Sequence, residues 1–280
     1  MGKKSSLRTS INVQRSKDLT HEKFMSEYGF PNKPVVISDG AWEWKAMSLW
    51  TLNFFKSEYG RTRLKVTKNL SEGKTRANIM TVNEYIDYVH YSKEDNPYYL
   101  RDWTLEIDFP ELLADYTIPS YFQNWLDRIP IEKNRPWWMW KGWKGWIFIG
   151  PKGTGTQPHE DVVNSSAWLA LIQGKKRWAI LPPDNDQYLY KGKADVLNSD
   201  YEKYPLLAQA NPIYYIQQPG EIVFVPSGWW HQVHNEDVSI SLSGNFVNES
   251  NRKHFTKYLK DNNRHDDLRH FIQHIPELGV

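Results

Sequence analysis

The N-terminal half of the chain repeats apolar residues at the spacing of helices. Residues 21–30 and 49–60 both show this spacing, and Gly60 is placed to end the second helix. Residues 81–91 have apolar side chains at i, i+3, i+4 and i+7, which predicts an amphipathic helix. Two segments, KPVVIS and NPYYLRD (96–102), read instead as extended chain.

From Trp137 onward the pattern changes to short strand-like runs separated by Gly, Pro, Asn and Asp. The runs are WIFIG, SAWLALIQG, KRWAILPP, EIVFVP, HQVHN and VSISLSGNFV. Their spacing is typical of an antiparallel barrel or jelly roll. After Asn248 the pattern is polar and helical again. We expect one structural domain made of a polar tail (1–20), an α/β layer packed on the barrel (21–136), the β core (137–248) and C-terminal helices (249–280).

The amino-acid composition excludes several classes of protein. The 280 residues are 40% hydrophobic and 15% aromatic, enough for a substantial core, and the net charge is only +2. This balance argues against a dedicated nucleic-acid partner. The absence of cysteine excludes disulfides and thiolate ligands, so a metal would bind His, Asp or Glu. No apolar run approaches the roughly 20 residues of a membrane span. A cytoplasmic protein is expected, with a nuclear location left open.

A candidate metal site begins at His159-Glu160-Asp161. On a strand, His159 and Asp161 point to one face while Glu160 points to the other. His231, 72 residues after His159, is the candidate third ligand from another strand. Two histidines and one carboxylate on one face form the triad typical of non-haem Fe(II) oxygenases, which leaves coordination positions open.

Two alternatives to this ligand set stay open. Glu160 would replace Asp161 if the strand register differed by one residue. His234 competes with His231, although three positions along a strand place it on the opposite face.

The second feature that points to a binding function is a lysine. If residues 175–181 form a strand, Lys176 shares a face with Trp178 and Ile180. A lysine in an apolar interior is costly unless an anion pairs with it. In the other register Lys175 would point inward and Lys176 would lie at the surface.

The stretches GTGTQPHEDVVNSSAWLALIQGKKRWAILPP and PGEIVFVPSGWWHQVHN resemble the Jumonji-C (JmjC) oxygenase family. The similarity is strongest to its lysyl-hydroxylase-like members, one of which was once described as a phosphatidylserine receptor. KPVVISDGAWEW, WTLNFFKSEYG and NPYYLRD resemble the family's N-terminal region, so the resemblance covers most of the chain. It implies a mainly β fold, a double-stranded β-helix (a jelly-roll, cupin-like barrel), and a dioxygenase that uses Fe(II), 2-oxoglutarate and O₂.

The resemblance also implies residue roles. His159, Asp161 and His231 match the iron ligands. The positions matching residues that contact 2-oxoglutarate are Thr156, Lys176, Tyr99, Ser243 and Asn245. Tyr98 is the alternative to Tyr99, one position away. Leu169 departs from the family, because relatives often carry there an asparagine that helps to bind 2-oxoglutarate. Either another polar group such as Asn245 compensates, or the pocket binds the keto-acid somewhat more weakly.

The implied activity is hydroxylation of a protein or peptide side chain, with lysine favoured and with release of succinate and CO₂. The alternatives are an N-methyl demethylase, a hydroxylase of an amino acid or other small molecule, and a non-catalytic cupin-like binding protein. The aromatic segment Trp137–Trp146 is interpreted as barrel packing or as a wall of the substrate entrance. The C-terminal helices would form a homodimer contact or cap the barrel.

Overall fold

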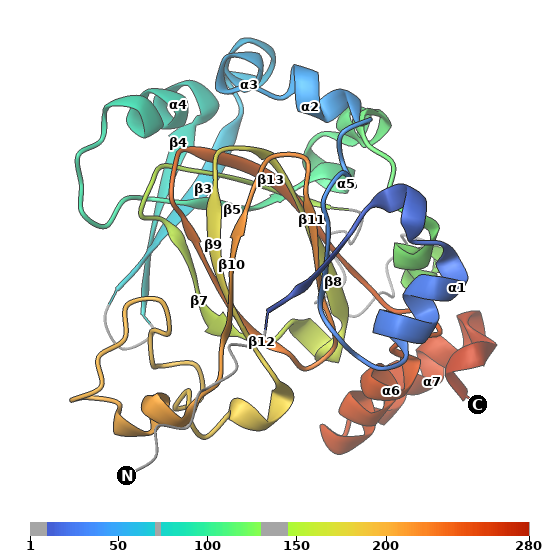
Figure 1. The fold of residues 1–280 in the computed structure, drawn as a ribbon. Helices are drawn as coiled ribbons and strands as arrows, with labels where there is room; N and C mark the ends of the chain where they lie inside the picture. The colour runs from blue at the N-terminus through green and yellow to red at the C-terminus, as the bar shows by residue number, and fades with distance from the viewer. Residues whose placement is uncertain (1–9, 71–73, 130–144, 280) are drawn as a thin grey trace.

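Two β-sheets face each other at the centre of the molecule (Figure 1). The computed structural model describes residues 10–70, 74–129 and 145–279. The larger sheet has the order β1-β2-β11-β8-β13-β6-β5 and the smaller sheet the order β10-β9-β12-β7. The strands of the larger sheet are β1 (Asn12–Gln14), β2 (Val35–Ile37), β5 (Leu100–Thr104), β6 (Trp146–Gly150), β8 (Ser166–Gln173), β11 (Ile222–Val225) and β13 (Ser239–Phe246). Those of the smaller sheet are β7 (Gly155–His159), β9 (Lys176–Leu181), β10 (Ile213–Gln217) and β12 (Trp230–Asn235).

The chain crosses repeatedly between the sheets from β6 to β13. Strands β6, β8, β11 and β13 belong to the larger sheet, while β7, β9, β10 and β12 belong to the smaller one. Each of these eight pairs antiparallel with its neighbours. The inner faces enclose an apolar cluster that includes Leu169, Trp178, Val223 and Val233. The predicted antiparallel core is therefore confirmed.

Helices cover the outer face of the larger sheet and one end of the barrel (Figure 1). They are α1 (His21–Phe24, continued by a π-helical turn over Met25–Gly29), α2 (Lys45–Leu49), α3 (Leu52–Tyr59), α4 (Val82–Tyr91), α5 (Leu105–Asp108), α6 (Arg252–Asp261) and α7 (His265–His274). The predicted helices over 21–30, 49–60 and 81–91 are confirmed, and Gly60 follows the last residue of α3. Because the structure contains these helices as well as the sheets, the fold is mixed α/β and not mainly β as predicted.

The segment before α1 departs from its predicted character as a polar tail. Residues 12–14 form β1, which pairs in parallel with β2 at the edge of the larger sheet. A hairpin of β3 (Arg63–Asn69) and β4 (Thr75–Thr81) was also not predicted. None of the helices in the described residues has the length and apolar character needed to cross a membrane.

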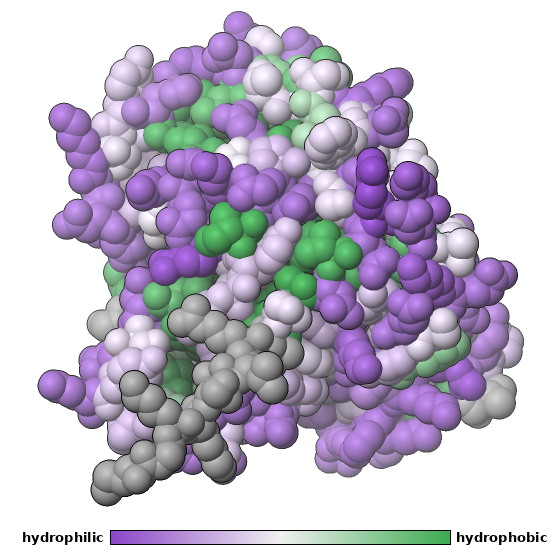
Figure 2. Space-filling model, viewed as in Figure 1, coloured by the Kyte–Doolittle hydropathy of each residue, from purple (hydrophilic) through white to green (hydrophobic). Residues whose placement is uncertain are grey.

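The surface above the smaller sheet is mostly hydrophilic in the view of Figure 2. Apolar side chains gather near the centre of this face, over β10. On that strand Tyr214 and Ile216 are exposed, whereas Ile213 and Gln217 are buried. Some apolar side chains of this edge strand are therefore exposed to solvent.

Candidate active site

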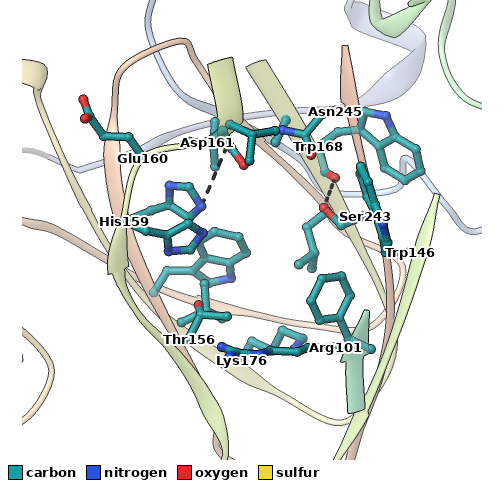
Figure 3. A pocket seen from close by; sticks show the side chains of 18 of the residues that line it. Arg101, Trp146, Thr156, His159, Glu160, Asp161, Trp168, Lys176, Ser243 and Asn245 are labelled. Carbon is teal, nitrogen blue, oxygen red and sulfur yellow. Dashed lines mark hydrogen bonds and ion pairs between the residues drawn. The ribbon is translucent and has the colours of Figure 1, made fainter. Parts of the chain in front are cut away.

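A cavity of about 410 Å³ lies between the two sheets (Figure 3). Its walls come from β5, β6, β8, β11 and β13 of the larger sheet and from β7, β9 and β12 of the smaller one. This volume lies in the range of pockets that bind small molecules. All the residues singled out from the sequence for metal and co-substrate binding line it.

His159, Asp161 and His231 come together in the cavity, and Figure 3 shows His159 and Asp161 away from the end that holds Lys176 and Arg101. One candidate ligand atom from each of the three lies within 4.8 Å of the others. The two histidines are cross-strand partners in the β7–β12 pair, and their ring centroids are 4.2 Å apart. Within the described residues this is the one group of three such side chains close enough to share a metal ion.

Asp161 reaches the site by a different route from the one predicted. The sequence interpretation placed His159 and Asp161 on one face of one strand, but β7 ends at His159. Asp161 instead precedes a short 3-10 turn over Val162–Asn164. Its carboxylate therefore owes its position to the turn rather than to strand alternation.

Backbone carbonyls fix the orientation of both imidazoles. Nδ1 of His159 lies 2.8 Å from the carbonyl oxygen of Gln157, and Nδ1 of His231 lies 3.2 Å from that of Trp229. An Nδ1–H that donates to a carbonyl leaves Nε2 with a lone pair for a metal. Oδ2 of Asp161, 3.9 Å from Nε2 of His231, is buried without a hydrogen-bond partner among the described residues. The three groups thus offer metal-binding atoms.

Burial favours the neutral form of the His159 imidazole. Burial lowers the pKa of His159 to about 4, and the neighbouring His231 contributes to the same direction. A histidine must be neutral to bind a metal, so His159 is in the form that binds a cation near neutral pH.

The alternative ligands do not join the group. Nε2 of His234 lies 3.1 Å from Nε2 of Gln232, on the side of β12 away from the triad. Glu160 is exposed, and Figure 3 shows its carboxylate directed away from the other labelled residues.

The opposite end of the cavity holds a buried lysine. Lys176 is 1% exposed, and its Nζ donates to Oδ1 of Asn235 at 2.8 Å and to the hydroxyl of Tyr99 at 3.2 Å. No carboxylate of the described residues forms an ion pair with it. Burial accordingly lowers the pKa of Lys176 to about 7. Lys175 is exposed, so the register that points Lys176 inward is the observed one.

Tyr99 also points inward, where Gly150 leaves room for its ring. A Cβ on Gly150 would lie 2.4 Å from that ring. The neighbouring Tyr98 instead packs against Tyr88, with ring centroids 5.9 Å apart. Thr156 Oγ1 is buried and lacks a hydrogen-bond partner among the described residues. Lys176, Tyr99 and Thr156 together offer donors to an anion.

The remaining predicted positions lie on β8 and β13. Ser243 Oγ donates to the carbonyl oxygen of Trp168 at 2.8 Å, and Asn245 Nδ2 donates to Ser165 Oγ at 3.0 Å. Leu169 contributes an apolar surface to the cavity. Of the aromatic segment interpreted as a possible entrance, only Trp146 lies within the described residues, and it lines the cavity.

Two residues of the site were missed in the sequence. Asn235 holds Lys176, and strand alternation from His231 would have placed it on the cavity face. Arg101 lines the cavity two positions after Tyr99.

The fold and this site define a cupin-like protein with an internal group of side chains that could hold a metal ion. The chain belongs to the cupin-like domain family, whose model matches residues 21–267. The resemblance to JmjC proteins is likewise confirmed by curated relatives.

Three relatives illustrate the similarity. The chain is 32% identical over 253 residues to the "Lysine-specific demethylase JMJ21" of Arabidopsis thaliana, covering 86% of this chain and 26% of the relative. It is 30% identical over 260 residues to the "Bifunctional arginine demethylase and lysyl-hydroxylase psr-1" of Caenorhabditis elegans, covering 87% and 63%. It is 32% identical over 276 residues to the "2-oxoglutarate and iron-dependent oxygenase JMJD4" of Danio rerio, covering 88% and 62%. The matches thus span less than two thirds of each of these relatives.

Proposed function

We propose that the protein is an Fe(II)- and 2-oxoglutarate-dependent oxygenase that hydroxylates a protein or peptide side chain. The observation that carries the proposal is the placement of the His159, Asp161 and His231 triad in one cavity with the buried Lys176. We also infer that β6–β13 form the double-stranded β-helix of this enzyme class, because the strands alternate between two facing sheets in the observed order.

The side chains present fit both groups. Two imidazoles and one carboxylate that has an oxygen without a hydrogen-bond partner among the described residues suit Fe(II). Lys176, Tyr99 and Thr156 suit the distal carboxylate of 2-oxoglutarate, since no described residue gives Lys176 an anionic partner or Thr156 Oγ1 a hydrogen bond. When bound, the iron and keto-acid supply the oxidation of a C–H bond by O₂, with release of succinate and CO₂.

The protein's own contribution is to hold and shield these groups. Carbonyls of Gln157 and Trp229 fix the two imidazole rings. The apolar side chains of Leu169, Trp178 and Val233 line the cavity and exclude water from it. Ser243 and Asn245 add polar groups on the side of β13, where we propose that they contact the keto-acid or the substrate.

Lysine is the side chain we favour as the substrate. Support comes from the relative named as a bifunctional arginine demethylase and lysyl-hydroxylase. Relatives named as demethylases favour N-demethylation as a second candidate. Both reactions would use the same cavity and differ in the carbon that is presented.

Mass spectrometry after anaerobic loading and exposure to O₂ separates the candidates. The protein would receive Fe(II) and 2-oxoglutarate, then lysine-containing peptides or their N-methylated forms. Gain of one oxygen atom by the unmethylated peptide is the expected result. Loss of a methyl group without any stable oxygenated product would establish demethylation instead. Absence of both products and of succinate would leave a binding protein and contradict the proposal.

A further inference from the structure

Arg101 lies where the active-site cavity meets a second cavity. The second cavity, of about 240 Å³, is bordered by residues 67–70 at the end of β3, the segments 95–97 and 153–154, the outward-facing residues of β7, Asp195 and His234. Arg101 and Tyr99 are the residues that line both cavities. Figure 3 shows Arg101 at the same end of the active site as Lys176 and Thr156.

The guanidinium of Arg101 has no partner among the described residues. No hydrogen bond, ion pair or ring contact joins it to another side chain there. Lys68, the other strongly basic residue of the second cavity, is paired with Glu94 at 2.8 Å. Arg101 therefore presents a positive charge at the junction that no described residue pairs with.

Its position suits a ligand that enters from outside rather than the deep co-substrate. Lys176 is 1% exposed and lines the active-site cavity together with the donors Tyr99 and Thr156. Arg101 is half-buried, so it keeps access to the solvent-connected second cavity. A single distal carboxylate is satisfied by the charge of Lys176, which leaves Arg101 available.

Arg101 also restricts what can enter. With 2-oxoglutarate paired to Lys176, an incoming lysine side chain would still meet the cation of Arg101, and like charges in a partly buried site repel each other. An anion carried by the same substrate would remove this repulsion at Arg101. Guanidinium is well suited to this because it can bind a carboxylate with two parallel hydrogen bonds.

We propose that Arg101 is a specificity-determining residue that binds a substrate carboxylate lying next to the reacting side chain. The substrate class is a polypeptide with Asp or Glu beside the modified residue. This inference rests on the proposed function, since it assumes that the active-site cavity takes 2-oxoglutarate and a substrate together.

Calorimetric titration of the Mn(II)- and 2-oxoglutarate-loaded protein tests the proposal. The probes are three lysine-containing pentapeptides that differ only in the residue next to lysine, which is Glu, Gln or Lys. The wild type is expected to bind the Glu peptide roughly tenfold or more tightly than the Gln peptide. Arg101→Glu should reverse the order to favour the Lys peptide, while Arg101→Lys should keep the wild-type order.

Lys152→Gln is the matched control, because it removes one positive charge from an exposed position outside both cavities. It should leave the ranking unchanged. Free glutamate forms a further arm: binding of glutamate but no peptide, lost in Arg101→Glu, would support carboxylate recognition with a small-molecule source.

Three results would overturn the proposal. They are an unchanged peptide ranking in Arg101→Glu, no binding of any probe to the wild type, and a loss of 2-oxoglutarate affinity in Arg101→Gln as large as in Lys176→Ala. The last result would make Arg101 a co-substrate residue. Failure of the proposed function would appear separately, as absence of 2-oxoglutarate binding by the metal-loaded wild type.

Discussion

Nζ of Lys176 lies 2.8 Å from Oδ1 of Asn235, the residue directly opposite it in the β9–β12 pair. Nδ2 of Asn235 donates to Thr154 Oγ1 at 2.8 Å, and this hydroxyl donates to the carbonyl oxygen of Pro151 at 2.6 Å. The chain of hydrogen bonds orients the amide so that its oxygen faces the lysine. The turn before β7 thereby fixes the position of the buried cation.

Asn235→Ala should therefore weaken 2-oxoglutarate binding without disturbing the metal. Loss of a hydrogen bond to a charged group costs about 1.5–3 kcal/mol, so we expect roughly tenfold or greater loss of affinity. Calorimetric titration of the Mn(II)-loaded protein measures the affinity for 2-oxoglutarate, and titration of the metal-free protein with Mn(II) measures the affinity for the metal. Asn198→Ala, at an exposed position, is the control. Unchanged 2-oxoglutarate affinity in Asn235→Ala would show that the amide does not position Lys176.

Lys176→Ala should raise the 2-oxoglutarate requirement roughly 10- to 150-fold while metal binding stays nearly unchanged. The reason is that Lys176 is the buried cation of the cavity, whereas Lys175 is exposed. Lys175→Ala is the matched control and should have little effect. Succinate formation at increasing 2-oxoglutarate measures the difference. Equal effects of the two substitutions would refute the assignment.

Binding of 2-oxoglutarate should be accompanied by proton uptake above neutral pH. Burial lowers the pKa of Lys176 to about 7, so at pH above this value the side chain is mostly neutral before binding. An adjacent carboxylate favours the charged form and raises the pKa again, so binding takes up a proton and weakens as pH rises. Titrations in buffers of different ionisation enthalpy measure this uptake. Its persistence in Lys176→Met would assign the proton to another group.

Tyr85→Phe should destabilise the wall that carries Tyr99 and Arg101. The buried hydroxyl of Tyr85 donates to the carbonyl oxygen of Ile149 at 2.6 Å and accepts from the backbone N–H of Leu100 at 3.0 Å. Without it the free energy of unfolding should fall by about 1–3 kcal/mol, because a buried N–H loses its acceptor. Urea denaturation measures the change. Tyr91→Phe, on the exposed face of the same helix, should be neutral.

Parts of the fold with regular patterns could be predicted from the sequence. The amphipathic pattern of α4 is complete, and Thr81 and Glu84 add a capping box at its start. Alternation along β9 gave the orientation of Lys176 once the register was chosen. The β3–β4 hairpin was missed because β4 is largely exposed and carries no apolar alternation.

Parts of the site that depend on turns or long-range pairing could not be predicted in the same way. The carboxylate of Asp161 is placed by a turn after β7, and no periodicity describes such a turn. The partnership of Asn235 with Lys176 requires knowing that β12 pairs with β9. That no described residue pairs with Arg101 becomes visible only when the described side chains around it are placed.

The visible absorption of the anaerobic protein with Fe(II) and 2-oxoglutarate tests the central claim most directly. A keto-acid that chelates Fe(II) produces a charge-transfer band, so the band reports the metal and the co-substrate together. We predict a band in the wild type and in His234→Ala, and its loss in His159→Ala, Asp161→Ala and His231→Ala, with circular dichroism confirming that each variant is folded. A wild type without the band, or a band that survives His231→Ala and disappears in His234→Ala, would contradict the account.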